Sequence, residues 1–111
     1  MDLGITTRQS GSTTVVSVTG ELDVHTATDL ELALGEMISN GQHDVVVDLR
    51  GLGFLDSTGL SVLVKALKWA KEAGGGLRVV AADDKISKVF TITGLDQAMS
   101  LSPTLPDGVA D

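Results

Sequence analysis

Apolar and polar positions change their period along the chain, and these changes mark successive strands and helices. Residues 13–19 are almost all β-branched and follow the turn signal Ser10-Gly11-Ser12, which predicts a strand paired as a hairpin with residues 3–7. From Thr26 onward apolar residues recur three and four positions apart, which predicts a helix that Asn40-Gly41 closes. The apolar face of this helix consists of Ala27, Leu30, Ala33, Leu34, Met37 and Ile38.

The rest of the chain continues to alternate strands with helices. Residues 44–49 form a short apolar run bounded by charges, which is typical of a strand covered on both faces. A helix over 57–73, a strand over 77–82 and a short helix over 84–93 follow. We expect residues 98–101 to add an edge strand and residues 103–111 to form a mobile tail.

This order of elements predicts a single α/β domain. An opening hairpin followed by alternating helices and strands is typical of a mixed sheet with helices packed on it. The chain has 111 residues, about the length of one domain, and 42% of them are apolar, which is enough to build a core. We therefore assign residues 1–102 to the domain and residues 103–111 to its tail.

Composition and charge exclude several classes of function. The 8 Lys and Arg residues against 15 Asp and Glu give a net charge of -7, which repels nucleic-acid phosphates and anionic lipids. The sequence has no cysteine to serve as a nucleophile or metal ligand. It also contains no apolar run of the ~18 residues that a membrane span needs, and no secretory signal at Met1-Asp2-Leu3-Gly4. We expect a cytoplasmic protein that has no cofactor, binds no nucleic acid and does not insert into a membrane.

The segment 53–60, Gly-Phe-Leu-Asp-Ser-Thr-Gly-Leu, joins a central strand to a helix and places three polar side chains at the junction. Such junctions at the carboxyl ends of strands are where open α/β sheets meet ligands and partners. One interpretation is structural: Asp56 or Ser57 caps the helix, which contributes about 1 kcal/mol. The other is functional: the loop docks a partner, and Gly59 lets the partner surface come close.

Phosphorylation of Ser57 would give this junction a switch. A serine hydroxyl at the start of a helix is exposed, and a phosphate there adds about -1.5 to -2 units of charge beside Asp56. Inside an interface, a dianion without a cationic partner costs several kcal/mol to desolvate, and each ~1.4 kcal/mol is a tenfold change in affinity. The modification would change docking far more than it changes the fold.

Catalytic interpretations of the same residues fail on their motifs. Leu55 stands where the nucleophile elbow Gly-x-Ser-x-Gly needs its first glycine, and no orienting motif surrounds His25 or His43. No P-loop or Rossmann glycine pattern is present. A phospho-accepting receiver needs an acidic pair after its first strand, whereas Asp83-Asp84 fits the start of a helix. We therefore reject esterase, nucleotide-binding and receiver chemistry for these residues.

The predicted second helix carries two apolar stripes. The first consists of Leu60, Leu63, Leu67 and Ala70, and the second of Val62, Ala66 and Trp69. One stripe faces the sheet, and the other is either core as well or a partner surface next to Ser57. The solvated face is expected to consist of Ser61, Lys65, Lys68 and Glu72.

Three motifs occur in order along the chain. They are Gly20-Glu21-Leu22-Asp23 after a strand, the segment 54–60 at the second helix, and the segment 89–96, Val-Phe-Thr-Ile-Thr-Gly-Leu-Asp. Together they resemble STAS domains, and among these the free-standing bacterial anti-sigma factor antagonists, over about residues 3–102. The resemblance implies a mixed sheet of about four to five strands with helices packed on it.

The resemblance also implies a mechanism. In this family the unmodified antagonist binds an anti-sigma factor that is a serine kinase using ATP, and thereby frees a sigma factor. Phosphorylation of the motif serine, here Ser57, ends the binding, and a metal-dependent phosphatase restores it. Because the chemistry belongs to the kinase, the resemblance implies that this chain is a substrate and ligand and not an enzyme. By the same resemblance, Asp56, Thr58 and Gly59 are partner contacts of the docking loop. By the resemblance, Glu21 and Asp23 form an acidic turn that lies near this site, and the turn touches the partner.

One departure and one alternative follow from the resemblance. Many members carry glycine where this chain has Ser61. Further along the same helix this chain has Lys65 and Lys68. A bulkier and more basic helix is expected to alter which kinase docks. The family also contains domains that serve anion transporters, lipid-transfer systems and stress sensors. The alternative is therefore a non-catalytic STAS subunit of a transport or stress-sensing assembly, in which Ser57 is only a helix cap.

Overall fold

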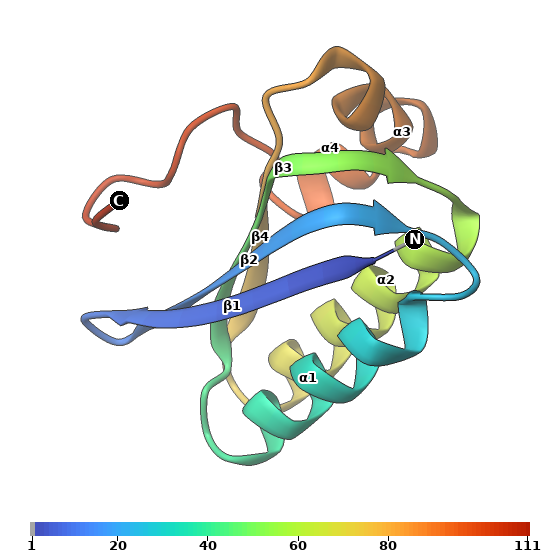
Figure 1. Cartoon of the computed structure of the whole chain (residues 1–111). Coiled ribbons are helices and arrows are strands. Elements are labelled where there is room, and N and C mark those ends of the chain that lie inside the picture. Colours follow the sequence, from blue (N-terminus) through green and yellow to red (C-terminus); the bar gives the residue numbers. More distant parts are fainter. Residues whose placement is uncertain (1) are drawn as a thin grey trace.

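The computed structural model describes residues 2–111, which form a four-stranded mixed sheet with helices packed on it (Figure 1). β1 (Leu3–Ser10) pairs antiparallel with β2 (Thr13–Leu22), as the predicted hairpin requires. β2 runs parallel to β3 (Asp44–Leu55), and β3 runs parallel to β4 (Gly76–Val80). The order across the sheet is β1-β2-β3-β4, and the fold class expected from the sequence is confirmed.

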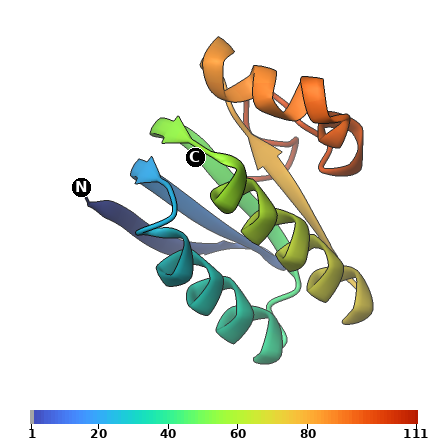
Figure 2. The same ribbon diagram turned by 90° about the vertical axis from the view of Figure 1, so that its right-hand side faces the viewer.

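Two long helices cover one face of the sheet side by side (Figure 2). α1 (Ala27–Ser39) connects β2 to β3, and α2 (Ser57–Glu72) connects β3 to β4. Right-handed crossovers between consecutive parallel strands place both helices on the same face. α3 (Asp84–Thr93) and α4 (Leu95–Ala98) follow β4, and Asp83 caps α3 as its sequence position predicts.

The main core lies between the sheet and the helices. Its fully buried side chains include Val16, Leu22, Leu30, Leu34, Val47, Leu63 and Phe90. The second stripe of α2 belongs to this core, because Val62 and Ala66 are buried and Trp69 is half-buried against Gly35 of α1. Val62 and Ala66 are therefore part of the core and not a partner surface, whereas Trp69 stays partly exposed at its rim; Ser61, Lys65, Lys68 and Glu72 are exposed as predicted.

The structure corrects several predicted bounds. β1 continues from the predicted 3–7 to Ser10, β2 from 13–19 to Leu22, so Gly20, Glu21 and Leu22 end this strand instead of following it, and β4 is Gly76–Val80 instead of 77–82. β3 continues past the apolar run 44–49 to Leu55, because its pairing with β2 resumes after register shifts beyond Ser17 and Gly20. The predicted edge strand over 98–101 is wrong: α4 ends at Ala98, and only Ser102 forms a bridge with Val80. Backbone hydrogen bonds to Met99 and Ser102 nevertheless cover the free edge of β4.

The C-terminal segment lies on the opposite face of the sheet (Figure 1). Leu105 and Val109 pack against a second, small cluster of buried residues that consists of Val15, Val46 and Val80. The Ala110 N–H donates to Ser10 Oγ at 3.0 Å, and Asp111 accepts from Arg50 Nη2 at 3.2 Å. These contacts give the segment a defined position on the sheet, and the mobility of residues 103–111 stays a prediction.

Gly59 and Gly35 lie in α2 and α1, and opposite effects are expected when each is changed to alanine. A Cβ at Gly59 would lie 2.6 Å from Leu22 Cγ and 3.0 Å from Leu55 Cδ1. At Gly35 the nearest atom, Trp69 Cζ3, would be 3.5 Å away, an ordinary contact. We expect Gly59→Ala to lower the free energy of unfolding by about 1–2 kcal/mol and Gly35→Ala to raise it by about 0.5–1 kcal/mol. Urea denaturation of both variants tests this, and a stabilised Gly59→Ala protein would contradict it.

The ion pair between Asp48 and Arg50 is expected to make the free energy of unfolding depend on pH in the acidic range. The Arg50 side chain donates to Asp48 at 2.9 Å and 2.8 Å and lowers the pKa of that carboxyl, while burial acts in the opposite direction. A carboxyl with a lowered folded-state pKa stabilises the fold above its unfolded pKa of ~3.9, and this stabilisation is lost as pH falls through the folded-state pKa.

We expect Asp48→Asn to lower the free energy of unfolding by about 1–3 kcal/mol near pH 7. Between about pH 4 and about pH 2 the variant should lose less stability than the parent protein, because it lacks the titrating group. Asp107→Asn, at an exposed acid, is the control and should follow the parent protein. Parallel urea titrations at several pH values measure the difference, and equal acid losses for Asp48→Asn and the parent would rule out this role of Asp48.

Candidate functional site

The carboxyl edge of the parallel strands brings two turns together. The register of β2 and β3 places Glu21 opposite Phe54 and Leu22 opposite Leu55. Just beyond the paired residues, the Asp56 N–H donates to the Leu22 carbonyl at 3.2 Å. The acidic turn after β2 and the loop before α2 therefore adjoin each other, as predicted for Glu21, Asp23 and the segment around Ser57.

Asp56 is the residue that caps α2. Its backbone is extended, with φ of -108° and ψ of -178°, and its Oδ1 accepts a hydrogen bond from the Gly59 N–H at 3.0 Å. This bond satisfies one of the unpaired N–H groups of the first helical turn. Of the two capping residues that the sequence allowed, the structure selects Asp56.

Ser57 is left at the first position of the helix with an exposed side chain. Its carbonyl accepts from Ser61 Oγ at 2.9 Å, and among residues 2–111 its hydroxyl has no hydrogen-bond partner. Thr58 is exposed beside it. The interpretation of Ser57 as a helix cap is thus wrong, because Asp56 already performs that role and the Ser57 hydroxyl faces solvent.

Gly59 has an internal reason to be glycine. It is buried, and a Cβ there would overlap with Leu22 and Leu55, the last residues of β2 and β3. Its missing side chain lets the first turn of α2 come close to the ends of both strands. The contact of Gly59 with a partner stays a prediction.

Asp23 is used to fold the acidic turn. Its Oδ1 accepts from the backbone N–H of His25 at 2.8 Å and from that of Thr26 at 3.1 Å. The hydrogen bond from His25 is the largest of the effects that lower the pKa of the Asp23 carboxyl, so the turn carries a firmly ionised group. Thr26 Oγ1 in turn donates to the Glu21 carbonyl at 2.8 Å, which ties the turn to the end of β2.

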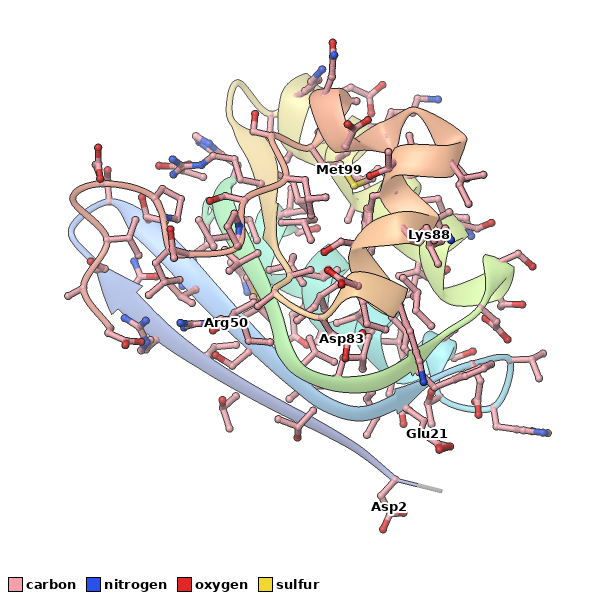
Figure 3. The ribbon with its side chains drawn as sticks, turned by 90° about the horizontal axis from the view of Figure 1, so that it is seen from above. Asp2, Glu21, Arg50, Asp83, Lys88 and Met99 are labelled. Atoms are coloured by element: carbon pink, nitrogen blue, oxygen red, sulfur yellow. The ribbon has the colours of Figure 1, made fainter. Side chains whose placement is uncertain are left out.

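Glu21 lies at the outer rim of this edge. Figure 3 shows its side chain directed away from the sheet, on the same side as Asp2. The Glu21 N–H donates to the Asp2 carbonyl at 3.4 Å, so the start of the described chain also borders the site. Together with Asp23 and Asp56, Glu21 gives the surroundings of Ser57 a negative charge.

Two apolar residues at this edge were not among the predicted site residues. Val24, in the acidic turn, is 62% exposed, and Phe54, opposite Glu21, is 48% exposed. The signal in the sequence is that Val24 stands alone between polar residues, outside any strand or helix period. Exposed apolar groups ringed by polar ones are typical of protein-binding surfaces.

The described residues provide no evidence of a metal centre or a membrane span. Within residues 2–111, no three side chains of His, Asp or Glu come together as candidate metal ligands. In the same part of the chain, none of the helices has both the length and the apolar character that crossing a bilayer requires. The chemistry that the site offers is that of an exposed hydroxyl on an acidic and partly apolar surface.

Comparison with known protein sequences gives a consistent result. The family model described as "Mlab, STAS domain" matches residues 5–105. The chain is 36% identical over 102 residues to the anti-sigma-B factor antagonist of Staphylococcus aureus strain NCTC 8325, covering 92% of this chain and 94% of that protein.

Solved structures agree with this comparison. The crystal structure of an anti-sigma factor antagonist from Mycobacterium paratuberculosis is similar with a TM-score of 0.87 and 33% identity, covering 96% of this chain and 91% of that one. The anti-sigma factor antagonist SpoIIAA in its unphosphorylated form has a TM-score of 0.77 at 21% identity, covering 89% of this chain and 88% of that one. This second likeness shows a shared fold.

Substitutions at Asp56 and Ser57 test which of the two residues caps α2. We expect Asp56→Ala to lower the free energy of unfolding by about 1 kcal/mol, because it removes the acceptor for the Gly59 N–H. Asp56→Ser keeps a capping oxygen and should stay close to the parent. Ser57→Ala should change stability by less than about 0.5 kcal/mol. Thermal and urea denaturation measure these differences, and a larger loss in Ser57→Ala than in Asp56→Ala would reverse the assignment.

Proposed function

The chain belongs to the STAS domain family, and we propose that it acts as an anti-sigma factor antagonist that is switched off by phosphorylation of Ser57. The relatives named anti-sigma-B factor antagonist, similar over nearly their whole length, support the regulatory role. Such a protein works by binding and not by catalysis. We infer a cytoplasmic location, where sigma factors and their regulators act.

The observation that carries the proposal is the division of roles between Asp56 and Ser57. Asp56 caps the helix, so Ser57 is free of any structural hydrogen bond through its hydroxyl among residues 2–111. A phosphate can be added to this exposed oxygen without breaking a bond that holds the fold. The modification therefore acts on the surface that a partner meets.

The surface around Ser57 explains why a phosphate would end binding. The apolar residues Val24 and Phe54 provide area that a partner can bury, and the carboxylates of Glu21 and Asp23 already make this surface negative, so a further negative charge is unfavourable there. A phosphoserine in this contact brings in about -1.5 to -2 units of charge beside Asp56. Removing water from that dianion costs several kcal/mol unless a cation compensates it, which corresponds to a loss in affinity of more than tenfold.

The proposed partner is an anti-sigma factor that is also a serine kinase. In the transfer step, Ser57 Oγ forms a bond to the γ-phosphorus of ATP as the bond to the ADP oxygen breaks, and a base of the kinase takes the hydroxyl proton. Binding of the unmodified chain would release the sigma factor, and transfer would end the complex. A metal-dependent serine phosphatase would hydrolyse the phosphate and restore the antagonist.

The proposal predicts how variants of Ser57 bind. Immobilised parent protein and Ser57→Ala should both capture an ATP-binding anti-sigma kinase from host lysate, identified by mass spectrometry, and Ser57→Asp should not. With the purified kinase, Ser57→Asp should bind at least about tenfold more weakly, because it places a fixed charge in the interface. Incubation with ATP should add one phosphate to the parent at Ser57 and none to Ser57→Ala.

A matched control separates this effect from net charge. Ser12→Asp adds the same charge at an exposed serine in the turn before β2, at the opposite edge of the sheet from Ser57. It should bind the kinase as the parent does. Equal binding by Ser57→Asp and the parent, or capture of a transport or sensory complex by every variant alike, would disprove the proposed switch.

A further inference from the structure

The helices α1 and α2 run side by side (Figure 2). A groove lies between their carboxyl-terminal halves, at the end of the helix pair remote from Ser57. Its volume is about 870 Å³, within the range of sites that hold ligands or groups of side chains. The apolar residues that line it are Leu32, Gly35, Ile38, Trp69 and Ala73. Because α2 has 16 residues, the groove and Ser57 are separated by roughly 20 Å along the helix.

The groove presents apolar side chains to solvent. Leu32 is 66% exposed, although it belongs to a helix whose other large apolar residues are buried. Trp69 is half-buried, packs close to Gly35 and lines the groove together with it. An exposed leucine alone is common on protein surfaces, but a leucine beside an accessible tryptophan in a concave site is typical of a binding surface.

The rim of the groove carries two glutamates at helix carboxyl ends, where the helix dipole disfavours negative charge. Glu36 lies in the last turn of α1 and Glu72 in the last turn of α2, where the partial negative charge of a helix end repels a carboxylate. α1 has no basic residue in its last turn, and α2 has Lys71. The third acid, Glu31, is paired with Lys65 at 2.9 Å. A cationic group bound from outside would relieve the repulsion at Glu36 and Glu72.

We propose that this groove docks a cationic amphipathic helix of a partner protein. Apolar side chains of that helix insert between Leu32 and Trp69, and its lysines or arginines pair with Glu36 and Glu72. This mode of recognition, an amphipathic helix in an apolar groove, needs a few apolar anchors and a charged rim of the opposite sign. The groove is separate from the edge that carries Ser57, so this docking does not depend on the proposed switch.

Trp69 makes the proposal directly measurable. It is the one tryptophan of a sequence without tyrosine, so fluorescence excited in the indole band reports on the groove. The probe is a synthetic amphipathic helix of about 14 residues built from leucine and lysine. We expect a saturable blue shift of Trp69 emission on titration with this peptide, and no shift with the matching leucine and glutamate peptide.

Charge-reversed variants locate the binding. Glu36→Lys with Glu72→Lys should weaken peptide binding at least tenfold, and Leu32→Gln should weaken it severalfold. The control, Asp2→Lys with Asp107→Lys, makes the same change in net charge at exposed acids outside the helices and the groove. It should change the affinity by less than twofold. The lysines of the first double variant stand at helix ends that favour cations, so its melting temperature should not fall.

Several outcomes would overturn the proposal. Equal weakening by the two double variants would mean that the peptide responds to net charge alone. Absence of a Trp69 shift would mean that the peptide does not occupy the groove. A shift that appears with rising protein concentration in the absence of peptide, with a dimer in sedimentation velocity, would assign the groove to a second copy of the chain. Loss of peptide binding in Ser57→Asp would contradict the independence of the two sites, whereas failure of the kinase test alone would leave the groove unaffected.

Discussion

The parallel pairing of β2 with β3 is the constraint on which the rest of the structure depends. Its register sets Leu22 beside Leu55, and the hydrogen bond from Asp56 to the Leu22 carbonyl extends the pairing into the loop. The first turn of α2 can then rest on both leucines because Gly59 has no side chain. A slip of one residue would turn the buried face of β2 outward and separate the acidic turn from Ser57.

Much of the fold follows from patterns that lie within short segments. The period of α1, the β-branched run of β2 and the glycines after α2 each act locally, and their elements form where they were predicted. The exceptions depend on distant contacts. Leu95–Ala98 forms a helical turn because Met99 must enter the core, and β3 extends to Leu55 because β2 offers a partner there. Neither contact is visible in a local period.

In the candidate site, too, local patterns were predictable from the sequence and features set by distant contacts were not. The segment Asp56-Ser57-Thr58-Gly59 lies at the junction of β3 and α2, as its sequence position predicts, and Glu21 and Asp23 were expected near it. The sequence did not decide which of Asp56 and Ser57 caps the helix, because both residue types are good caps and the choice depends on the backbone angles of one residue. Val24 and Phe54 were missed because their exposure results from where β2 and β3 end, not from their own residue type.

The antiparallel direction of β1 has a consequence for how the molecule can be joined to others. Since Leu3 pairs with Gly20, the chain enters the sheet at the edge where Ser57 lies. Its last residues cross the face of the sheet that the long helices leave free and end at Asp111, which contacts Arg50 (Figure 3). Any segment fused ahead of Asp2 therefore emerges next to the loop that carries Ser57 and would crowd the proposed docking surface. A fusion after Asp111 emerges behind the sheet and leaves that loop open.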